Sequence, residues 1–426
     1  MQGLWSQCSS ARLFPRSGCV VMNFKAMRED FPTLRSSDAP AYLDNACVTL
    51  KPQSVIDSIH RYYSETPGCG GRSVHRYGTA VSKGVSDARK GLAEFINAES
   101  TNEVVFTRNA THSINQIAHG MSWNKGDVVL TTDREHNSNL VPWLQLEQER
   151  GIDHRVVRSF EDNTFDLEAF EESCKSAGSN LRMVSMSHVG NLDGVSIPIR
   201  EIAKIAHDFD ALVAVDGAQS TPHMNVDVQQ LGIDFLSFSI HKMCGPSGMG
   251  GLWGKYELLD GLRTIQSGGQ TVASSTYTDA IWAQPPARFE GGLGNFSGML
   301  ATGAAIEYLS TLDMDAVHQQ EVSLNKIMTK GVKDLAGLEI IGPEDASKRG
   351  GICSILMDKL PAHDVALLLD EAAGVMVRSG QHCVHSWFAD KGLPQGSLRA
   401  SAYFYNTEED VKRFVDTLTE IVHTLS

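Results

Sequence analysis

Short apolar runs alternate with amphipathic stretches through the middle of the chain. Seven runs are typical of buried strands, at residues 104–107, 127–132, 154–159, 181–189, 211–217, 235–240 and 250–254. Stretches with helical periodicity lie between them, including residues 58–65, 113–123, 139–151 and 199–210. This alternation predicts an α/β fold with a mostly parallel, seven-stranded sheet and helices on both of its faces.

The pattern changes from about Gly303 onward. The later segments suggest helices and strands in mixed order: a helical stretch at 303–338, a strand at 350–358, a helix at 363–374, strands at 375–380 and 397–405, and a helix at 407–425. Thr407 is a plausible N-cap of the last helix, which has acids in its first turn. We therefore expect a large domain at residues 31–302, whose first residues are free to pack against a small α+β domain at 303–426.

One segment of the large domain shows neither the periodicity of a strand nor that of a helix. Residues 270–286, QTVASSTYTDAIWAQPP, suggest a long irregular loop. Compact domains usually keep such loops for function.

Composition narrows the class of protein. The 426 residues include 37 Lys and Arg against 51 Asp and Glu, a net charge of −14 that argues against nucleic-acid binding. No apolar run reaches the roughly 18 residues of a membrane span, so no membrane association is expected. The 8 cysteines form no CxxC pair, which favours a reducing, cytoplasmic setting.

Residues 1–30 are expected to be an N-terminal extension. The first 22 residues contain two Arg, several Ser and no acid, a weak resemblance to an organelle transit peptide. The favoured interpretation is a start placed too far upstream, with translation beginning at Met22 or Met27. The fold is expected to begin near Phe31.

Polar residues of the types that enzymes use for catalysis and cofactor binding follow the buried strands. Lys242 follows His241 at the end of the strand at 235–240, where a lysine by itself would simply reach solvent. Asp216 and Gln219 follow the preceding strand. An acid in that place can pair with a protonated pyridine nitrogen, which is what pyridoxal phosphate (PLP) requires to act as an electron sink.

Residues that follow three further strands are also suited to binding PLP. Thr111 and the backbone N–H groups at the start of a helix form a phosphate site. His136 is placed to stack on a flat ring, and Asn191 to donate to a phenolic oxygen or a substrate carboxylate. Each residue also has an ordinary role as a cap or turn former. Together, five strand ends that each supply one part of one site favour a PLP enzyme.

The motifs as a set resemble a known family. The motifs resemble those of the class V aminotransferases, in the order A-T, E-H-N-x-N, H-V-x-N, V-D-G-A-Q, S-x-H-K, F-E-G-G, R-S-G-x-H-C and R-A-S. Within that family it is most similar to the group II (Suf-type) cysteine desulfurases, which include selenocysteine lyase-like members. The resemblance extends from Phe31 to the C-terminus and implies a homodimeric fold-type I PLP enzyme.

The resemblance also implies a role for each residue. Lys242 carries the Schiff base, Asp216 holds the pyridine nitrogen, His136 stacks on the ring and Gln219 bonds the phenolic oxygen. The phosphate is held by Thr111, Ser239 and His241, while Ala110 and Asn191 also count among the cofactor-binding residues. The substrate is held by Asn45, Ala46, Arg72, His75, Asn191, Arg378 and Arg399, and the guanidinium of Arg399 matches a carboxylate.

The sequence departs from the family pattern at two positions. Leu293 stands where many members have a Thr that reaches the phosphate of the partner subunit. The backbone of Gly294 and Asn295, or the hydroxyl of Ser297, is the expected substitute. Cys244 occupies a position that is often apolar or aromatic, and we interpret it as a packing residue.

Cys383 lies between His382 and His385 in a loop-like stretch. A metal site needs three or four converging ligands, and one Cys with two His that point differently does not provide them, so no metal is expected. The loop setting also argues against a buried structural thiol. A mobile, exposed nucleophile fits better, with the imidazoles and Arg378 favouring the thiolate.

These residues predict conversion of L-cysteine to L-alanine. Lys242 removes the Cα proton, Cys383 attacks the substrate sulfur and becomes a persulfide, and His136 passes protons between cofactor and substrate. The loop between Cys383 and Arg399 is short, as it is in group II members, which depend on a partner protein to accept the sulfur. A sulfur-acceptor or Fe–S scaffold protein is therefore expected to take the sulfur from this protein. The alternatives are a selenocysteine lyase, a class V aminotransferase or epimerase, and an inactive scaffold.

Overall fold

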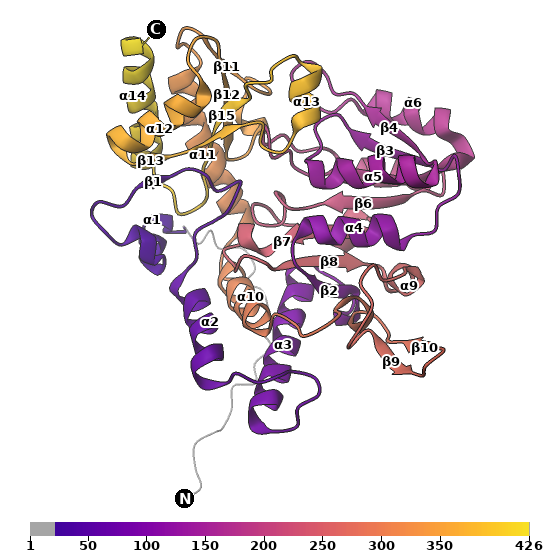
Figure 1. The fold of residues 1–426 in the computed structure, drawn as a ribbon. Coiled ribbons are helices and arrows are strands. Elements are labelled where there is room, and N and C mark those ends of the chain that lie inside the picture. The colour runs from indigo at the N-terminus through magenta and orange to yellow at the C-terminus, as the bar shows by residue number, and fades with distance from the viewer. Residues whose placement is uncertain (1–21, 426) are drawn as a thin grey trace, which may run out of the picture.

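A seven-stranded sheet organises the larger lobe of the computed structural model, which describes residues 22–425 (Figure 1). The strand order is β2-β8-β7-β6-β5-β3-β4. Only β8 runs antiparallel to its neighbours, so the predicted mostly parallel sheet is confirmed. The strands are β2 Val104–Thr107, β3 Val128–Thr132, β4 Asp153–Val157, β5 Leu181–Ser187, β6 Leu212–Asp216, β7 Phe235–Ser239 and β8 Gly250–Gly254.

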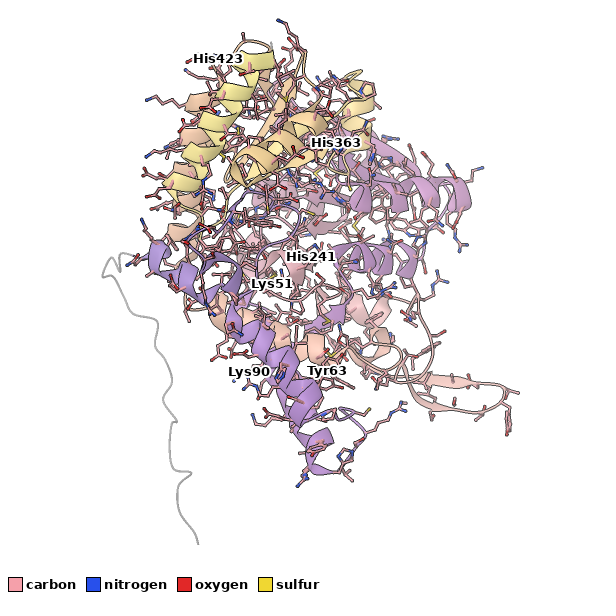
Figure 2. All side chains as sticks on the ribbon, turned by 60° about the vertical axis from the view of Figure 1, so that its left-hand side comes forward. Lys51, Tyr63, Lys90, His241, His363 and His423 are labelled. Atoms are coloured by element: carbon pink, nitrogen blue, oxygen red, sulfur yellow. The ribbon has the colours of Figure 1, made fainter. Side chains whose placement is uncertain are left out.

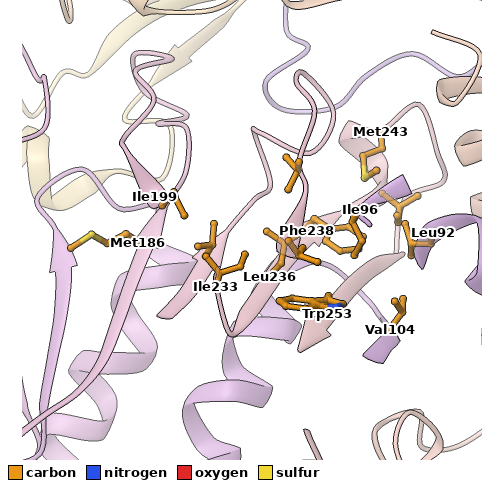
Figure 3. Packing of buried hydrophobic residues seen from close by; sticks show 14 of the residues in the cluster. Leu92, Ile96, Val104, Met186, Ile199, Ile233, Leu236, Phe238, Met243 and Trp253 are labelled. Carbon is orange, nitrogen blue, oxygen red and sulfur yellow. The ribbon is translucent and has the colours of Figure 1, made fainter. Parts of the chain in front are cut away.

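Helices cover both faces of this sheet, because side chains alternate along each strand. Leu236 and Phe238 of β7 join the main core beneath α3 and α7 (Figure 3), whereas Phe235 packs with α4, α5 and α9 on the other face. The helices of this lobe are α2 Gln53–Glu65, α3 Arg76–Phe95, α4 Ala110–Gly120, α5 Asn137–Arg150, α6 Leu167–Ala177, α7 Ile199–His207, α8 Val228–Leu231, α9 Tyr256–Gly261 and α10 Phe296–Leu309.

The C-terminal lobe contains a four-stranded antiparallel sheet in the order β11-β12-β15-β14. Its strands are β11 Leu338–Ile340, β12 Ile352–Met357, β14 Arg378–Gly380 and β15 Ser397–Ser401, and its helices are α11 Met314–Val332, α12 Ala362–Ala373, α13 His385–Asp390 and α14 Glu408–Leu425. Thr407 does begin α14: its hydroxyl accepts the N–H of Asp410 at 3.2 Å. The single helix predicted at 303–338 is wrong, because Asp313 caps a new helix, α11.

An early segment of the chain belongs with this lobe. Strand β1 Ala41–Tyr42 pairs in parallel with β13 Val375–Met376, and Asp44 bridges to Ser401. The strand predicted at 375–380 is therefore split, since β13 and β14 enter different sheets. In the opposite direction, Tyr403 and Phe404 extend from the C-terminal lobe into the main core. The domain boundary at 302/303 stays a prediction.

The residues just before Phe31 form regular structure. Helix α1 Phe24–Met27 is followed by a 3-10 turn, and the guanidinium of Arg28 pairs with Asp410 at 2.8 Å. The questions of a transit peptide and of the true start fall on residues 1–21, outside the described residues.

The segment at 270–286 is not an irregular loop. It forms an antiparallel hairpin of β9 Val272–Ser275 and β10 Ala280–Trp282, which projects from the large lobe (Figure 1). Tyr277 at its tip is fully exposed. None of the helices within residues 22–425 is long and apolar enough to cross a membrane.

Candidate active site

One cavity of about 200 Å³ gathers most of the predicted site residues. It lies beyond the carboxyl ends of the parallel strands, where ligands bind in sheets of this kind. The predicted residues that line it are Ala46, Ala110, Thr111, His136, Asn191, Asp216, Gln219, Ser239, His241, Lys242, Arg378, Cys383 and Arg399.

Asn45, Arg72 and His75 are not among the residues that line the cavity. Asn45 is buried, and its amide donates to the carbonyl of Ser401 at 2.7 Å, so its side chain has a structural partner. Arg72 is exposed, and the Nδ1 of His75 accepts the Gly78 N–H as the N-cap of α3. Any substrate contact from these three residues stays a prediction.

Lys242 ends a short 3-10 turn, Ile240–Lys242, that directly follows β7. The residue is only 9% exposed. Burial lowers its pKa to about 8, with Arg399 acting in the same direction and Asp216 opposing. An amine with this pKa is partly uncharged near neutral pH and can take up a proton.

Asp216 and Gln219 lie beside Lys242 at the end of β6. Burial raises the pKa of Asp216, whereas the Ala218 N–H and Lys242 oppose that shift. Ala218 N–H donates to its Oδ1 at 2.9 Å. Gln219 donates to the carbonyl of Ala46 at 2.8 Å, while its buried Oε1 has no hydrogen-bond partner within residues 22–425. A carboxylate and an orphaned amide oxygen thus face one small space.

Hydroxyl groups surround the N-terminus of α4. Thr111 and Ser138 hydroxyls lie 2.6 Å apart, and the Ala110 N–H donates to Ser239 Oγ at 2.9 Å. The backbone N–H of Ala110, a residue expected to bind the cofactor, thus has a protein partner in this structure. Burial lowers the pKa of His241 to about 4, so its ring is neutral. Its carbonyl accepts from Lys51 Nζ at 2.9 Å, and the two residues lie side by side in Figure 2.

His136 is the N-cap of α5. Its Nδ1 accepts the Ser138 N–H at 3.0 Å, which leaves the ring proton on Nε2. Burial and the nearby Lys242 lower the pKa of His136 to about 3. The ring is therefore neutral and suited to stacking or to donating a hydrogen bond, and less suited to the acid–base role expected from the sequence.

Buried Glu135 fixes the start of α5 and was not singled out from the sequence. Its carboxyl accepts from the hydroxyls of Thr132 at 2.7 Å and Ser187 at 2.6 Å, and from the amide of Asn139 at 2.8 Å. These bonds tie the turn that carries His136 to β5. The sequence did offer a signal for Glu135, since this acid directly precedes His136, the residue expected to stack on the cofactor ring.

Arg399 and Asn191 connect the substrate side of the cavity to the Cys383 loop. Arg399 Nη1 donates to the carbonyl of Asn191 at 2.8 Å, and Nη2 lies 3.3 Å from Asp44 Oδ1. The Asn191 amide donates to the carbonyl of His382 at 2.7 Å. Asn191 was expected to donate to a cofactor or substrate oxygen, but in this structure its amide holds the loop. Asp44 was missed, although it directly precedes Asn45 and Ala46, which were expected to hold the substrate.

Cys383 lies in the turn between β14 and α13 and is half-buried. Cys383 and His382 both have left-handed backbone, with φ of 61° and 49°, which is uncommon for residues with a side chain. The Asn137 N–H donates to the Cys383 carbonyl at 2.7 Å. The expectation of a mobile, exposed thiol therefore does not match this anchored turn.

The flanking histidines differ from expectation. His382 Nε2 lies 2.9 Å from Ser397 Oγ, and burial lowers the pKa of His382 to about 2, so the ring carries no positive charge. His385 Nδ1 lies 2.7 Å from the amide of Asn137. Of the expected helpers of the thiolate, Arg378 on the cavity wall is the permanently charged one.

The two departures from the family pattern lie outside the cavity. Leu293 is 76% exposed. Asn295 caps α10 by accepting the Gly298 N–H, and Ser297 donates to Asn295. Cys244 is buried in the main core, which confirms its packing role, and burial raises its pKa to about 12. No group of three or more potential metal-ligand side chains is found within residues 22–425.

Comparison with known proteins agrees with this arrangement. The Aminotransferase class-V family profile matches residues 41–414. A probable cysteine desulfurase of Halalkalibacterium halodurans is 36% identical over 92% of this chain and 96% of its own. A cysteine desulfurase of Haloferax volcanii is 35% identical over 92% and 95%.

Solved structures share the fold. The apo cysteine desulfurase of Thermococcus onnurineus superposes with a TM-score of 0.89 at 33% identity, covering 94% of this chain and 98% of its own. A cysteine desulfurase of Escherichia coli gives 0.87 at 29% identity, covering 95% and 100%. With strand ends, cavity and relatives in agreement, this chain belongs to the class V aminotransferase family, in which these relatives are cysteine desulfurases.

Proposed function

We propose that the protein is a PLP-dependent cysteine desulfurase of the group II type, which converts L-cysteine to L-alanine and holds the sulfur as a persulfide on Cys383. The observation that carries the proposal is the single cavity that contains Lys242, Asp216 and Cys383 together. An aminotransferase or an epimerase has no use for the thiol on that wall.

The polar groups of the cavity suit PLP. Asp216 matches a pyridine nitrogen, Gln219 a phenolic oxygen, and the hydroxyls of Thr111 and Ser239 a phosphate, while His136 is neutral and available to stack. PLP supplies an electron sink for the carbanion formed at the substrate's Cα. The orphaned Oε1 of Gln219 is a group that the protein itself leaves unsatisfied.

The protein's own residues then carry out binding, proton transfer and sulfur transfer. Arg399 binds the substrate carboxylate, and its buried Nε, which has no partner within residues 22–425, is available for it. Lys242 Nζ takes the Cα proton. Cys383 Sγ attacks the substrate sulfur, and the carbon–sulfur bond breaks with its electron pair on Cβ. Protonation of Cβ and return of a proton to Cα then complete alanine.

The short connection from Cys383 to Arg399 supports the group II assignment. Because helix α13 follows the thiol directly, the persulfide stays near the cavity. An acceptor protein, such as an Fe–S scaffold or a sulfur shuttle, is proposed to collect the sulfur there. A homodimer in the cytoplasm belongs to the same proposal.

The test is an assay of alanine and sulfide from L-cysteine, with and without a thiol reductant. Cys383→Ala should abolish alanine formation from cysteine while PLP binding, followed by visible absorbance, persists. Undiminished alanine production by that variant would refute the role of the thiol. Wild-type activity on L-selenocysteine without activity on L-cysteine would instead identify a selenocysteine lyase.

A further inference from the structure

A second thiol lines the cavity and has no place in the mechanism above. Cys47 is half-buried and shares the cavity wall with Cys383. Its Sγ accepts a hydrogen bond from Arg378 Nη1 at 2.9 Å. Its backbone N–H donates to the carbonyl of Asp44 at 3.1 Å, so the thiol is held in a fixed turn.

The other thiols within residues 22–425 lie elsewhere. Cys174, Cys244 and Cys353 are buried in the cores. Cys69 is half-buried like Cys47 but does not line the cavity. Both Cys47 and Cys383 line the same cavity as Lys242, so both thiols lie in the neighbourhood of that amine.

A continuous set of polar contacts runs from one thiol to the other. The loop of Cys383 is held by Asn191, whose carbonyl accepts from Arg399. Arg399 in turn contacts Asp44. The Nε of Arg399 is fully buried without a partner in the described part of the chain, which indicates a ligand atom in the space that both thiols face.

We propose, on the basis of the proposed function, that Cys47 is a second sulfur-accepting residue that takes the terminal sulfur of the Cys383 persulfide. Cys47 Sγ attacks that sulfur and forms a new S–S bond. The bond from the terminal sulfur to Cys383 Sγ breaks, and its electron pair, with the Cys47 proton, passes to Cys383. One sulfur atom moves between two thiols, so no oxidant or reductant is consumed.

Arg378 gives the exchange a direction. A persulfide anion on Cys47 would lie against a guanidinium that is already 2.9 Å from Sγ. Charge-assisted contacts of this kind stabilise an anion more than neutral hydrogen bonds do. The transfer restores the Cys383 thiol for another substrate while the first sulfur remains bound.

The experiment uses the PLP-loaded enzyme and L-cysteine labelled with heavy sulfur, without reductant. Samples are alkylated at short intervals, and peptide mass spectrometry locates the label. Label should appear first on Cys383 and later on Cys47, and Cys47→Ser should reduce protein-bound sulfur about twofold. Cys383→Ala should leave both sites empty. Cys69→Ser is the matched control and should resemble the wild type.

Three outcomes would overturn the relay. Cys47 could stay unlabelled while Cys383 is labelled, Cys47 could be labelled in Cys383→Ala, or a disulfide between the two thiols could form with release of the labelled sulfur as sulfide. Absence of alanine from the wild-type enzyme is a different result, because it refutes the proposed function itself.

Discussion

Lys242 is the residue whose chemistry depends most directly on its surroundings. Burial lowers its pKa to about 8, and only the uncharged amine can remove the Cα proton. Proton removal should therefore increase with rising pH and level off above pH 8. We expect a rise of about tenfold between about pH 7 and 9.

The cleanest measurement isolates this step from sulfur transfer. In the PLP-loaded Cys383→Ala variant, exchange of the substrate's Cα hydrogen with deuterated solvent reports on Lys242 without the thiol. Lys242→Ala should show no exchange at any pH. A flat profile in the first variant would contradict the assignment of Lys242 as the base.

Asn191 is predicted to act by positioning the Cys383 loop. Its amide holds the His382 carbonyl, beside two residues with left-handed backbone. Asn191→Ala should reduce persulfide formation about tenfold, equivalent to loss of about one hydrogen bond, while slowing Cα exchange much less. Equal losses in both assays would instead indicate a direct contact of Asn191 with substrate or cofactor.

For single residues, the sequence predicted which ones gather at the site but not which groups they contact. Lys242, Asp216 and His136 line one cavity, because each follows a strand of the mostly parallel sheet. The partner of each side chain was not predictable. Asn191 bonds to His382, and Cys47 to Arg378. The residues of each pair are far apart in the sequence, and only the folded chain brings them together.

At the scale of elements, β8 and α4 meet where the phosphate is expected. A Cβ on Gly250 would lie 2.5 Å from the Asn109 backbone at the start of α4. Gly250→Ala should displace that helix end, lower stability by about 1–3 kcal/mol and weaken PLP binding. Absorbance titration with PLP measures the affinity. Gly261→Ala, which meets no atom within 4 Å, is the control, and equal PLP affinities in the two variants would contradict the prediction.

Most strands of the large sheet were predictable because they are largely buried. All seven begin and end within two residues of the predicted bounds, including the edge strand β4, of sequence DHRVV, which has a single buried residue. The β9–β10 hairpin was missed because its exposed Ser and Thr residues show no alternation. Residues 375–380 were predicted to form one strand, because no residue in this segment signals the break between β13 and β14, which belong to different sheets.

At the scale of the whole molecule, the two lobes are joined through Tyr403. This residue follows β15, lies fully buried in the main core and donates from its hydroxyl to the carbonyl of Pro222 at 2.7 Å. Tyr403→Phe leaves that carbonyl without a partner and should cost about 1–3 kcal/mol, visible as a lower urea midpoint. Tyr277→Phe, at the exposed hairpin tip, should change nothing. Equal midpoints for both variants would mean that this contact does not join the lobes.

The pairing of β1 with β13 has a consequence for synthesis on the ribosome. Residues 41–42 emerge early, but their partners at 375–376 emerge more than three hundred residues later. Until then the neighbouring Asp44 and Cys47 have neither Arg378 nor Arg399 beside them. The nascent chain can build its large sheet while the substrate side of the cavity stays open, so the reactive pocket is completed only after Arg378 and Arg399 have been synthesised.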